Sequence, residues 1–472
     1  MAETTTTGEC AVIKIKKKSQ VTIKNENGLD LTGKCKNVIK GGAESSIKFE
    51  ISNGEYIIHG NKTGIAFDHY LEFNGGSFKI ITETGDGIKS SPDETDNKSE
   101  GKIVINGGDF YIESYGDAFD VKKKIYINDG YFKIKTENGY DSTTFDKETM
   151  SAKGFKISNN ETGSEIIIKK GIFDLNTADD GIHSKGNLTI INGDFDIYTG
   201  DDGIHAGFNL TLGEKNTKNG PTINILSSYE GIEGQFLDIY YADIYINASD
   251  DGINAGNGTG GDDPRPKPGP TSQPEPEPRP QPPPLDNGLY IAIYDGKINV
   301  LCKGDGIDSN GDIHVHGGQI DVFSQGRDEG WRDEPIDHDG NFTLYNGEIL
   351  CGGNKGREIV HEGITKGNET FAYYMDKINA TQYLKIKDEN GKEIRRREIP
   401  KNIEYVFYSS LNLNKNYIFY VSDTPEGTET ELKFTFGKTP GDKEDGSDSD
   451  SGSNVIKFCF RNLIFGVMVL LL

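Results

Sequence analysis

The stretch ADDGIHSKGNLTIINGDFDIYTGDDGIHAG, residues 178–207, begins and nearly ends on the same five residues. Asp-Asp-Gly-Ile-His stands at Asp179–His183 and again, 22 residues later, at Asp201–His205. A repeat of this length is too short for a domain and too long for a single hairpin, but it is the length of one coil of a solenoid. The repeat therefore predicts a short structural unit stacked many times.

Within one unit, apolar and polar residues alternate as they do in β-strands. Leu188 and Ile190, and then Phe195 and Ile197, are expected to point inward while their neighbours point outward. An Asn-Gly pair between the two segments predicts a corner, because glycine readily takes the positive φ of such a bend. A third short strand is expected after each Asp-Gly. Three strands and three corners predict a triangular coil, which becomes stable only when neighbouring coils stack on it.

The motif recurs along most of the chain, usually at spacings of 21 to 31 residues. Its occurrences are TGIAF at 63–67, GDGIKS at 85–90, GDAFDV at 116–121, NGYDS at 138–142, ADDGIHS at 178–184, GDDGIHA at 200–206, SYEGIEG at 228–234, SDDGINA at 249–255, GDGIDS at 304–309 and DEPIDH at 333–338. Helical periodicity is missing, and Val, Ile, Thr, Tyr and Phe dominate the repeats, so the fold class is all-β.

Two longer gaps between motifs predict surface insertions, at about 143–164 and 257–287. The second contains a proline-rich segment, Pro264–Pro284, which is expected to be extended polyproline. Because the motif resumes in phase after it, we interpret this segment as a loop of one continuous solenoid and not as a linker between domains. The expected divisions are an N-terminal cap with the first strands at 1–50, a parallel β-helix at 51–356, a C-terminal β cap domain at 371–436, an acidic spacer at 437–453 and a hydrophobic tail at 454–472.

The chain is strongly acidic, with a formal net charge of -24 and only 33% hydrophobic residues. Phosphate-bearing partners would be repelled, so nucleic acid and anionic membrane surfaces are disfavoured. Cations or neutral ligands are favoured, and we expect a monomer.

The C-terminal residues predict a lipid anchor. Small residues at Ser451, Gly452 and Ser453 are followed by a spacer and the apolar run LIFGVMVLLL, the order of an attachment signal whose tail is removed. The alternative is a short membrane anchor, for which the interruptions at Lys457 and Arg461 are unfavourable. The N-terminal residues MAETTTTGEC show no secretory signal. We nevertheless expect an extracellular glycoprotein at the cell surface, with Asn-x-Ser/Thr sequons at Asn61, Asn97, Asn160, Asn187, Asn209, Asn247, Asn257, Asn341, Asn368 and Asn379.

The cysteines favour a single disulfide. Cys10 and Cys35 are 25 residues apart, about one coil, so stacking would bring them near the strand separation of roughly 5 Å that a disulfide tolerates. Cys302 and Cys351 are separated by nearly two coils, and they are not expected to pair.

Stacking turns the repeated aspartates into columns. Carboxylates about 4.8 Å apart repel by roughly 3–4 kcal/mol at an effective dielectric near 20, so such a column needs protons or a metal. Ca²⁺, which takes six to eight oxygen ligands, suits it at neutral pH. The alternative is that each Asp simply caps its own turn, but the second Asp in three coils favours calcium. The candidate ligands are Asp179, Asp180, Asp201, Asp202, Glu230, Asp250 and Asp251, and then Asp86, Asp117 and Asp305.

Other side chains are candidates for contact with a glycan. His183 and His205 are expected to stack outward as a pair, either as a polar face or as a transition-metal site. Trp331, the single tryptophan, fits stacking on a sugar or local packing. Tyrosines such as Tyr229 offer flat faces for pyranose rings and are equally good strand formers. The candidate polysaccharide-binding residues are Lys185, His183, His205, Tyr229 and Trp331.

Residues 50–355, with segments such as ADDGIHSKGNLTI, SYEGIEG, ASDDGINAGNG and GDGIDSNGDIHVHGGQI, resemble a known family: the secreted carbohydrate-binding domain-containing parallel β-helix proteins of cellulolytic anaerobes, related in shape to pectate lyases. The resemblance implies a right-handed, single-stranded parallel β-helix, calcium at the Asp-Gly edge, and plant cell-wall polysaccharides, including cellulose and acidic pectin, as ligands. The proline insertion and the tail depart from the family pattern.

The function that we expect is calcium-dependent binding of plant cell-wall polysaccharide at the cell surface. A polysaccharide lyase is the alternative enzyme, but it needs a positioned base beside the calcium, and few basic residues flank the Asp-Asp-Gly edge. No catalytic residue is assigned. The third alternative is a non-catalytic structural adhesin.

Overall fold

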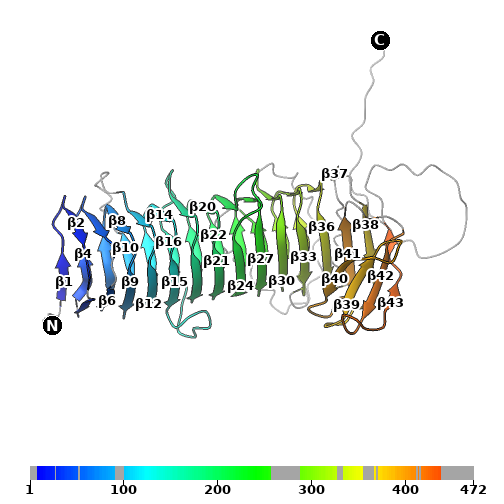
Figure 1. The fold of residues 1–472 in the computed structure, drawn as a ribbon, viewed down its shortest axis with the longest axis horizontal. Helices are drawn as coiled ribbons and strands as arrows, with labels where there is room; N and C mark the ends of the chain where they lie inside the picture. The colour runs from blue at the N-terminus through cyan, green and yellow to red at the C-terminus, as the bar shows by residue number, and fades with distance from the viewer. Residues whose placement is uncertain are drawn as a thin grey trace, which may run out of the picture.

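The computed structural model describes residues 8–26, 28–33, 35–51, 54–90, 100–256, 288–326, 333–354, 366–367, 370–410, 413 and 416–436. Every helix or strand assigned in these ranges is a β-strand, which confirms the all-β prediction. The strands follow one another in a long row, with the N-terminal strands at one end and the C-terminal domain at the other (Figure 1). Across the same ranges, no helix is long and apolar enough to cross a membrane.

Three long sheets, which we name A, B and C, run the length of the molecule. Sheet A contains β1 (Gly8–Lys14), β4 (Cys35–Lys40), β7 (Thr63–Phe67), β10 (Ile88–Ser90), β13 (Phe119–Val121), β16 (Phe155–Ile157), β19 (Ile182–Ser184), β22 (Ile204–Ala206), β25 (Ile232–Gly234), β28 (Ile253–Ala255), β31 (Ile307–Ser309) and β34 (Ile336–His338). Sheet B contains β2 (Gln20–Ile23), β5 (Ser46–Phe49), β8 (Tyr70–Phe73), β11 (Lys102–Ile105), β14 (Lys124–Ile127), β17 (Glu165–Ile168), β20 (Asn187–Ile190), β23 (Asn209–Leu212), β26 (Phe236–Ile239), β29 (Tyr290–Ile293), β32 (Asp312–Val315), β35 (Phe342–Leu344) and β37 (Lys366–Gly367).

Sheet C is parallel over its first twelve strands. These are β3 (Leu29–Gly33), β6 (Glu55–Gly60), β9 (Ser77–Thr82), β12 (Asp109–Ser114), β15 (Tyr131–Thr136), β18 (Ile172–Thr177), β21 (Asp194–Thr199), β24 (Thr222–Ser228), β27 (Ala242–Ala248), β30 (Gly296–Cys302), β33 (Gln319–Ser324) and β36 (Glu348–Gly353). Each coil contributes one strand to each sheet, and each strand pairs with the strand of the same type one coil away. The chain is therefore a parallel β-helix, as the repeat predicts.

The register carries like residues over like residues. Phe173 pairs with Phe195 and Leu175 with Ile197, and both pairs face the interior. A column of stacked aromatic rings fills the first half of the core, with centroid separations of 4.3 to 5.1 Å between neighbours. The column consists of Tyr56, Phe78, Phe110, Phe132, Phe173 and Phe195. Burial of these rings is a main source of stability for the stacked coils.

Glycine favours two kinds of corner for different reasons. At the Asn-Gly corner between sheets B and C, Gly193 has a φ of +128°, which an L side chain rarely adopts. At the Asp-Gly corner, Gly203 has no positive φ, but a Cβ there would lie 2.6 Å from the carbonyl oxygen of Gly231 in the next coil. A side chain at position 203 would therefore require the neighbouring coil to shift, although Ala118 stands at the equivalent position of an earlier coil.

The structure changes the boundaries expected from the sequence. The coil motif assigned to NGYDS at 138–142 is not a strand of sheet A. Inside the predicted insertion 143–164, residues 155–157 form β16, which pairs with β13 and β19 and buries Phe155. The true motif in this coil is Lys153-Gly-Phe-Lys156, in which lysine replaces the usual aspartate. The parallel β-helix also begins earlier than residue 51, because β1, β2 and β3 already pair with the strands of the next coil.

The solenoid continues in phase across residues 257–287, which lie outside the described residues. Strand β29, which follows this segment, pairs with β26, which precedes it, and with β32 of the next coil. The described coils on either side of this segment are therefore in phase, as expected for one continuous solenoid.

The C-terminal strands close the last coil. Strand β41 (Tyr405–Ser410) pairs antiparallel with β36 and is followed in sheet C by β38 (Thr370–Tyr374) and β44 (Thr435–Phe436). A separate antiparallel sheet contains β39 (Tyr383–Lys387), β40 (Glu393–Glu398), β42 (Ile418–Ser422) and β43 (Thr430–Leu432). The edge of the β-helix is thereby covered by a small β domain, and Arg395 Nη1 of this domain lies 2.8 Å from Glu348 Oε1 of the last coil.

Candidate functional site

Two columns of polar residues run along one corner and the adjoining outer face of sheet A. The first, which we name the corner column, stands two residues before the first residue of each sheet A strand from β10 to β34, and the residue after it is usually glycine. It contains Asp86, Asp117, Lys153, Asp180, Asp202, Glu230, Asp251, Asp305 and Glu334. The second, the strand column, stands three residues later and contains Lys89, Asp120, Lys156, His183, His205, Glu233, Asn254, Asp308 and Asp337, which are in register from strand to strand.

Several carboxylates of the corner column bind the backbone of the next coil. Asp117 N–H donates to Asp86 Oδ1 at 3.0 Å, and Asp202 N–H donates to Asp180 Oδ1 at 3.2 Å. Asp305 N–H likewise donates to Asp251 Oδ1 at 2.7 Å. Each of these aspartates therefore caps the following corner in addition to shaping its own turn. The predicted column of acidic residues exists, and the capping hydrogen bonds explain in part why aspartate recurs in it.

In the first half of the columns, lysines supply the positive charge that the stacked carboxylates require. Lys89 Nζ lies 2.7 Å from Asp86 Oδ2 and 2.6 Å from Asp120 Oδ2. Lys153 Nζ lies 2.5 Å from Asp179 Oδ1 and 2.7 Å from Asp180 Oδ2. Asp86, Asp179 and Asp180, which the sequence assigned to calcium, thus already have an ammonium group as their partner. Without displacement of the lysines, Asp86, Asp179 and Asp180 do not fit a calcium ion.

The pKa values follow from these ion pairs. Burial disfavours the charge on Asp180, but Lys153 and His183 outweigh it and hold the pKa of Asp180 well below its ordinary value. Burial also disfavours the charge on Lys153, but Asp180 and Asp179 outweigh it and raise the pKa of this lysine. Lys153 thus stays protonated and is a poor candidate for the base of a lyase reaction.

From Asp202 onward, neither column contains a lysine or an arginine. Burial, and then the charge of Asp180, raise the pKa of Asp202 to about 8. Burial, and then the charge of Asp251, raise the pKa of Asp305 to about 8. Burial is also the main reason that the pKa values of Glu230 and Asp308 lie well above their ordinary range. In this half of the columns, the charged form of these carboxyls is disfavoured because no lysine or arginine of the columns balances it, and a bound cation would favour that form.

Two lysine-free groups of donors in this half can hold a metal ion, and they differ in chemistry. Asp251, Asp305 and Asp308 place carboxylate oxygens within 4.8 Å of one another, and this oxygen-only set fits Ca²⁺. Asp202, His205 and Glu233 form an equally close set that includes an imidazole nitrogen. Two further groups are as close, but lysines already contact them: Lys89 contacts the group Asp86, Asp117 and Asp120, and Lys153 contacts the group Asp179, Asp180 and Asp201. The predicted ligands, apart from Glu230 and Asp250, are therefore divided among four clusters along the solenoid.

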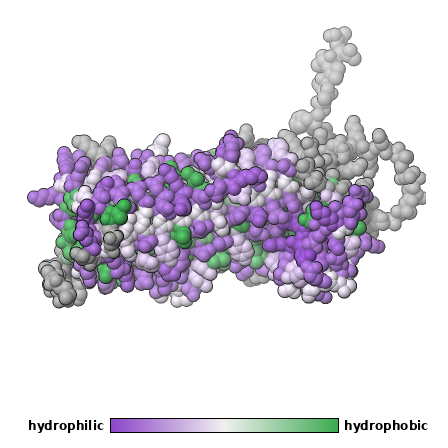
Figure 2. All heavy atoms as spheres, in the orientation of Figure 1, coloured by the Kyte–Doolittle hydropathy of each residue, from purple (hydrophilic) through white to green (hydrophobic). Residues whose placement is uncertain are grey.

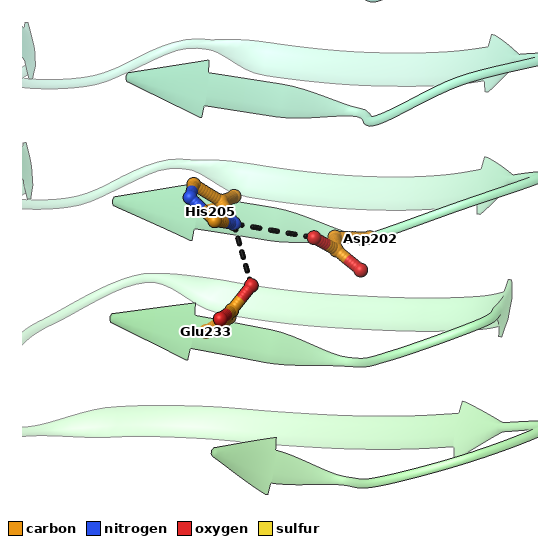
Figure 3. Close-up of side chains that lie close together, drawn as sticks. All are labelled: Asp202, His205 and Glu233. Carbon is orange, nitrogen blue, oxygen red and sulfur yellow. Dashed lines mark hydrogen bonds and ion pairs between the residues drawn. The ribbon is translucent and has the colours of Figure 1, made fainter. Parts of the chain in front are cut away.

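The two predicted histidines stack, with ring centroids 4.6 Å apart and an angle of 12° between planes. They are not freely exposed, however: the side chain of His183 is 13% exposed and that of His205 only 4%. Figure 3 shows His205 directed toward Asp202 of its own coil and Glu233 of the next. Their burial makes them unsuitable as surface contacts for a polysaccharide, and instead places them among the acidic residues.

The remaining predicted residues are dispersed. Lys185 and Tyr229 are exposed, and Tyr229 lines a cavity of about 290 Å³ together with His205. Asp250 is buried outside the four clusters, and Glu230 accepts a hydrogen bond from Asn254 Nδ2 at 3.2 Å. Trp331 and the predicted lipid-attachment residues Ser451, Gly452 and Ser453 lie outside the described residues.

The cysteines fit the predicted pattern of one bridge. Cys35 is disulfide-bonded, and Cys302 and Cys351 are free and buried. The predicted partner, Cys10, stands on β1 next to β4, which carries Cys35, and its side chain lies outside the described residues.

A groove of about 490 Å³ crosses the outer face of sheet C in the N-terminal half of the solenoid. Tyr111, 41% exposed, lies in it, with Lys79, Lys133 and Lys135 on the neighbouring strands. Glu55, Glu113 and Asp174 also line the groove, so its charges balance on a chain with a net charge of -24. The space-filling view shows that the visible face of the molecule is mostly hydrophilic, with scattered apolar spots (Figure 2).

Sequence reasoning missed the strand column, Lys153 and the groove around Tyr111. A signal for the strand column is present, because its members always stand three residues after the corner residue. Lys153 was hidden because the corner position in its coil is not acidic. Tyr111 stands in an ordinary alternating strand, and nothing in the local sequence distinguishes it.

Residues 2–203 match the family model described as carbohydrate-binding domain-containing protein, which supports a carbohydrate-binding role and covers both the groove and the first half of the columns. No curated protein matches the chain, and no solved structure does.

Proposed function

We propose that this protein binds plant cell-wall polysaccharide, either cellulose or acidic pectin, in a calcium-dependent manner at the cell surface. The observation that carries the proposal is the groove on sheet C, which lies within the residues that match the carbohydrate-binding family model. It combines an exposed tyrosine, hydrogen-bonding side chains and a locally balanced charge on a rigid sheet.

The geometry of the sheet suits an extended glycan. Successive strands are about 4.8 Å apart, which is close to the length of one pyranose residue. A chain lying along the solenoid axis can therefore repeat similar contacts from strand to strand. Tyr111 provides a flat apolar face, and Lys79, Lys133 and Lys135 provide donors to sugar hydroxyls and carboxylates.

Calcium has two roles in the proposal. At Asp251, Asp305 and Asp308 it would offset the repulsion between buried carboxylates and so stabilise the coils. It would also bridge the acidic protein to the carboxylates of pectin. A neutral glucan such as cellulose needs no such bridge, so its binding is expected to depend on calcium only through the stability of the solenoid.

The cellular part of the proposal rests on sequence. The small residues at 451–453 before the apolar tail support a lipid anchor, and the sequons support glycosylation outside the cell.

The test is retention of the full chain on insoluble cellulose and on immobilised polygalacturonate, each with calcium and with EDTA. We expect retention with calcium and, on polygalacturonate, its loss in EDTA. Absorbance at 232 nm is followed in the same samples, since release of unsaturated uronates would reveal a lyase. Failure to bind either glycan in calcium would contradict the proposal and favour the structural adhesin.

A further inference from the structure

Asp202, His205 and Glu233 converge on one point between two stacked coils (Figure 3). His205 Nδ1 lies 3.2 Å from Asp202 Oδ2 and 2.7 Å from Glu233 Oε2. Asp202 stands at the corner before β22, His205 on β22 and Glu233 on β25, so the backbone register of adjacent strands holds the set together. We propose that these three side chains bind a divalent transition-metal ion, of which zinc is the expected example.

The donor atoms distinguish this site from a calcium site. Calcium takes oxygen ligands, whereas an imidazole nitrogen together with carboxylate oxygens suits zinc, copper or nickel. Zinc bonds of about 2.0–2.2 Å place neighbouring donors roughly 3.3–3.5 Å apart in a tetrahedral site. The separation of 3.2 Å is already close to this value, and the separation of 2.7 Å reaches it through a small rotation of either side chain.

Charge and burial favour an ion at this point. The side chains of His205 and Glu233 are 4% and 6% exposed. Within the described part of the chain, His205 is the only basic group that contacts Asp202 or Glu233. One imidazolium balances one carboxylate, whereas a divalent ion balances both. An unbalanced buried carboxylate is costly.

Earlier coils of the same solenoid support this reading independently. Lys89 Nζ contacts Asp86 and Asp120, and Lys153 Nζ contacts Asp179 and Asp180, so each ammonium group lies between two carboxylates of the columns. The architecture thus places a cation between stacked acidic residues wherever a lysine is available. In the coil of Asp202 the columns contain no lysine, and a histidine nitrogen faces the same space.

The surroundings provide access and support for the ligands. The cavity of about 290 Å³ is lined by Asp202, His205 and Tyr229, so an ion can enter and a fourth ligand from solvent can complete the coordination. His183 stacks on His205 and fixes the plane of its ring, as residues around metal ligands commonly do. Its own Nδ1 lies 2.6 Å from Asp180 Oδ2, in the coil where Lys153 supplies the cation.

The experiment is a titration of the full chain, stripped of metal and transferred to chelator-free buffer, with Co²⁺ as a spectroscopic probe. We expect one equivalent of Co²⁺ to give visible d–d absorption, which Zn²⁺ abolishes by competition and excess Ca²⁺ does not. His205→Gln and Glu233→Gln should each weaken binding by more than about 100-fold, since loss of a residue that merely supports a ligand costs roughly 10- to 100-fold. The matched reference is His183→Gln, which removes the stacked neighbour but none of the three donors and should weaken binding by no more than about 10- to 100-fold, less than either ligand variant.

Circular dichroism establishes that each variant is folded, and Glu233→Gln preserves side-chain size if His205→Gln does not fold. Three results would overturn the proposal: a folded wild type that takes up no Co²⁺ or Zn²⁺, a folded His205→Gln or Glu233→Gln variant that binds as tightly as wild type, or displacement of Co²⁺ by equimolar Ca²⁺. No glycan is present in this assay, so its outcome is independent of the polysaccharide proposal.

Discussion

The backbone N–H of Asp202 donates a hydrogen bond to Asp180 Oδ1, 3.2 Å away, across one complete coil. The side chain of Asp180 therefore has both roles considered for the repeated aspartates: it caps a turn and it binds a cation. One oxygen of Asp180 caps the next coil, while the other lies 2.7 Å from Lys153 Nζ. The carboxylate is fixed by both contacts, and its charge is compensated within the protein.

Replacement of Lys153 by methionine should destabilise the solenoid strongly. It leaves Asp179 and Asp180 buried without their counter-charge, and breaking a buried pair in this way costs about 3–5 kcal/mol. The measurement is urea unfolding followed by circular dichroism. Lys133→Met is the control, because the pair of Lys133 with Asp174 is exposed and should contribute less than about 1 kcal/mol.

The loss of unfolding free energy in Lys153→Met should also depend on pH. In the wild type, the lowered pKa of Asp180 gives stability that is present at neutral pH and lost as pH falls through the folded-state pKa. This contribution of Asp180 is still nearly complete at pH 4, because its folded-state pKa lies well below that pH. In the variant, burial without the lysine disfavours the charged forms of Asp179 and Asp180, and their protonation at low pH relieves the penalty, so the difference in unfolding free energy between wild type and variant should be larger at pH 7 than at pH 4. A deficit of equal size at both pH values would contradict the assigned role of Lys153.

The lysine-free half should show the opposite pH dependence. The pKa of Asp305 is raised to about 8 in the folded state, above its ordinary value near 4, so the folded state binds more protons between these values. In EDTA, the contribution of Asp305 to the stability of the fold is present below about pH 4 and is lost as pH rises toward 8. Thermal unfolding of wild type and Asp305→Asn from pH 5 to 8 measures it as the difference between their slopes.

Calcium provides the second arm of that measurement. If the cluster of Asp251, Asp305 and Asp308 binds Ca²⁺, the added ion should raise the melting temperature of the wild type at pH 8 and have a smaller effect at pH 5, where protons compete. Asp305→Asn should respond less at both pH values. A wild-type melting temperature that calcium leaves unchanged at pH 8 would argue against the calcium site.

The glycine of the Asp-Gly corner offers a test of close stacking. Gly203→Ala would put a Cβ 2.6 Å from Gly231 O, and relief of such a contact requires the coils to separate. Overpacking of this kind typically costs about 1–3 kcal/mol. Gly107→Ala is the matched control, because a Cβ there meets nothing within 4 Å and the residue has no positive φ. Comparable urea midpoints for both variants would contradict this account.

The sequence predicted the architecture well because a solenoid repeats one local pattern. Alternation placed Leu188, Ile190, Phe195 and Ile197 in the core, and Asn192-Gly193 at a corner, since both follow from strand geometry and backbone sterics alone. Stacking of His183 on His205 also followed from their equal positions in the motif.

What the sequence left undecided depends on contacts between coils and on the excursions from them. Lys147 and Met150, in the excursion before β16, line the same cavity as His183 and His205, so a face expected to be open is partly covered. Likewise, the ion pairs of Lys153 could be predicted only if its coil were already known to be in phase with the others. The antiparallel register of β41 on β36 joins residues about 60 positions apart, which alternation cannot specify.

Tyr111→Ala should weaken binding of polysaccharide by about tenfold, or roughly 1.4 kcal/mol, with little loss of stability, because the ring is 41% exposed. The matched control is Tyr245→Ala, which occupies the same outward column of sheet C and is 37% exposed, but is not among the residues that line the groove. Affinity is measured by depletion onto insoluble cellulose and by calorimetry with oligogalacturonates in calcium. Equal losses in both variants would mean that the glycan contact is not confined to the groove, and no loss in either would place the glycan elsewhere.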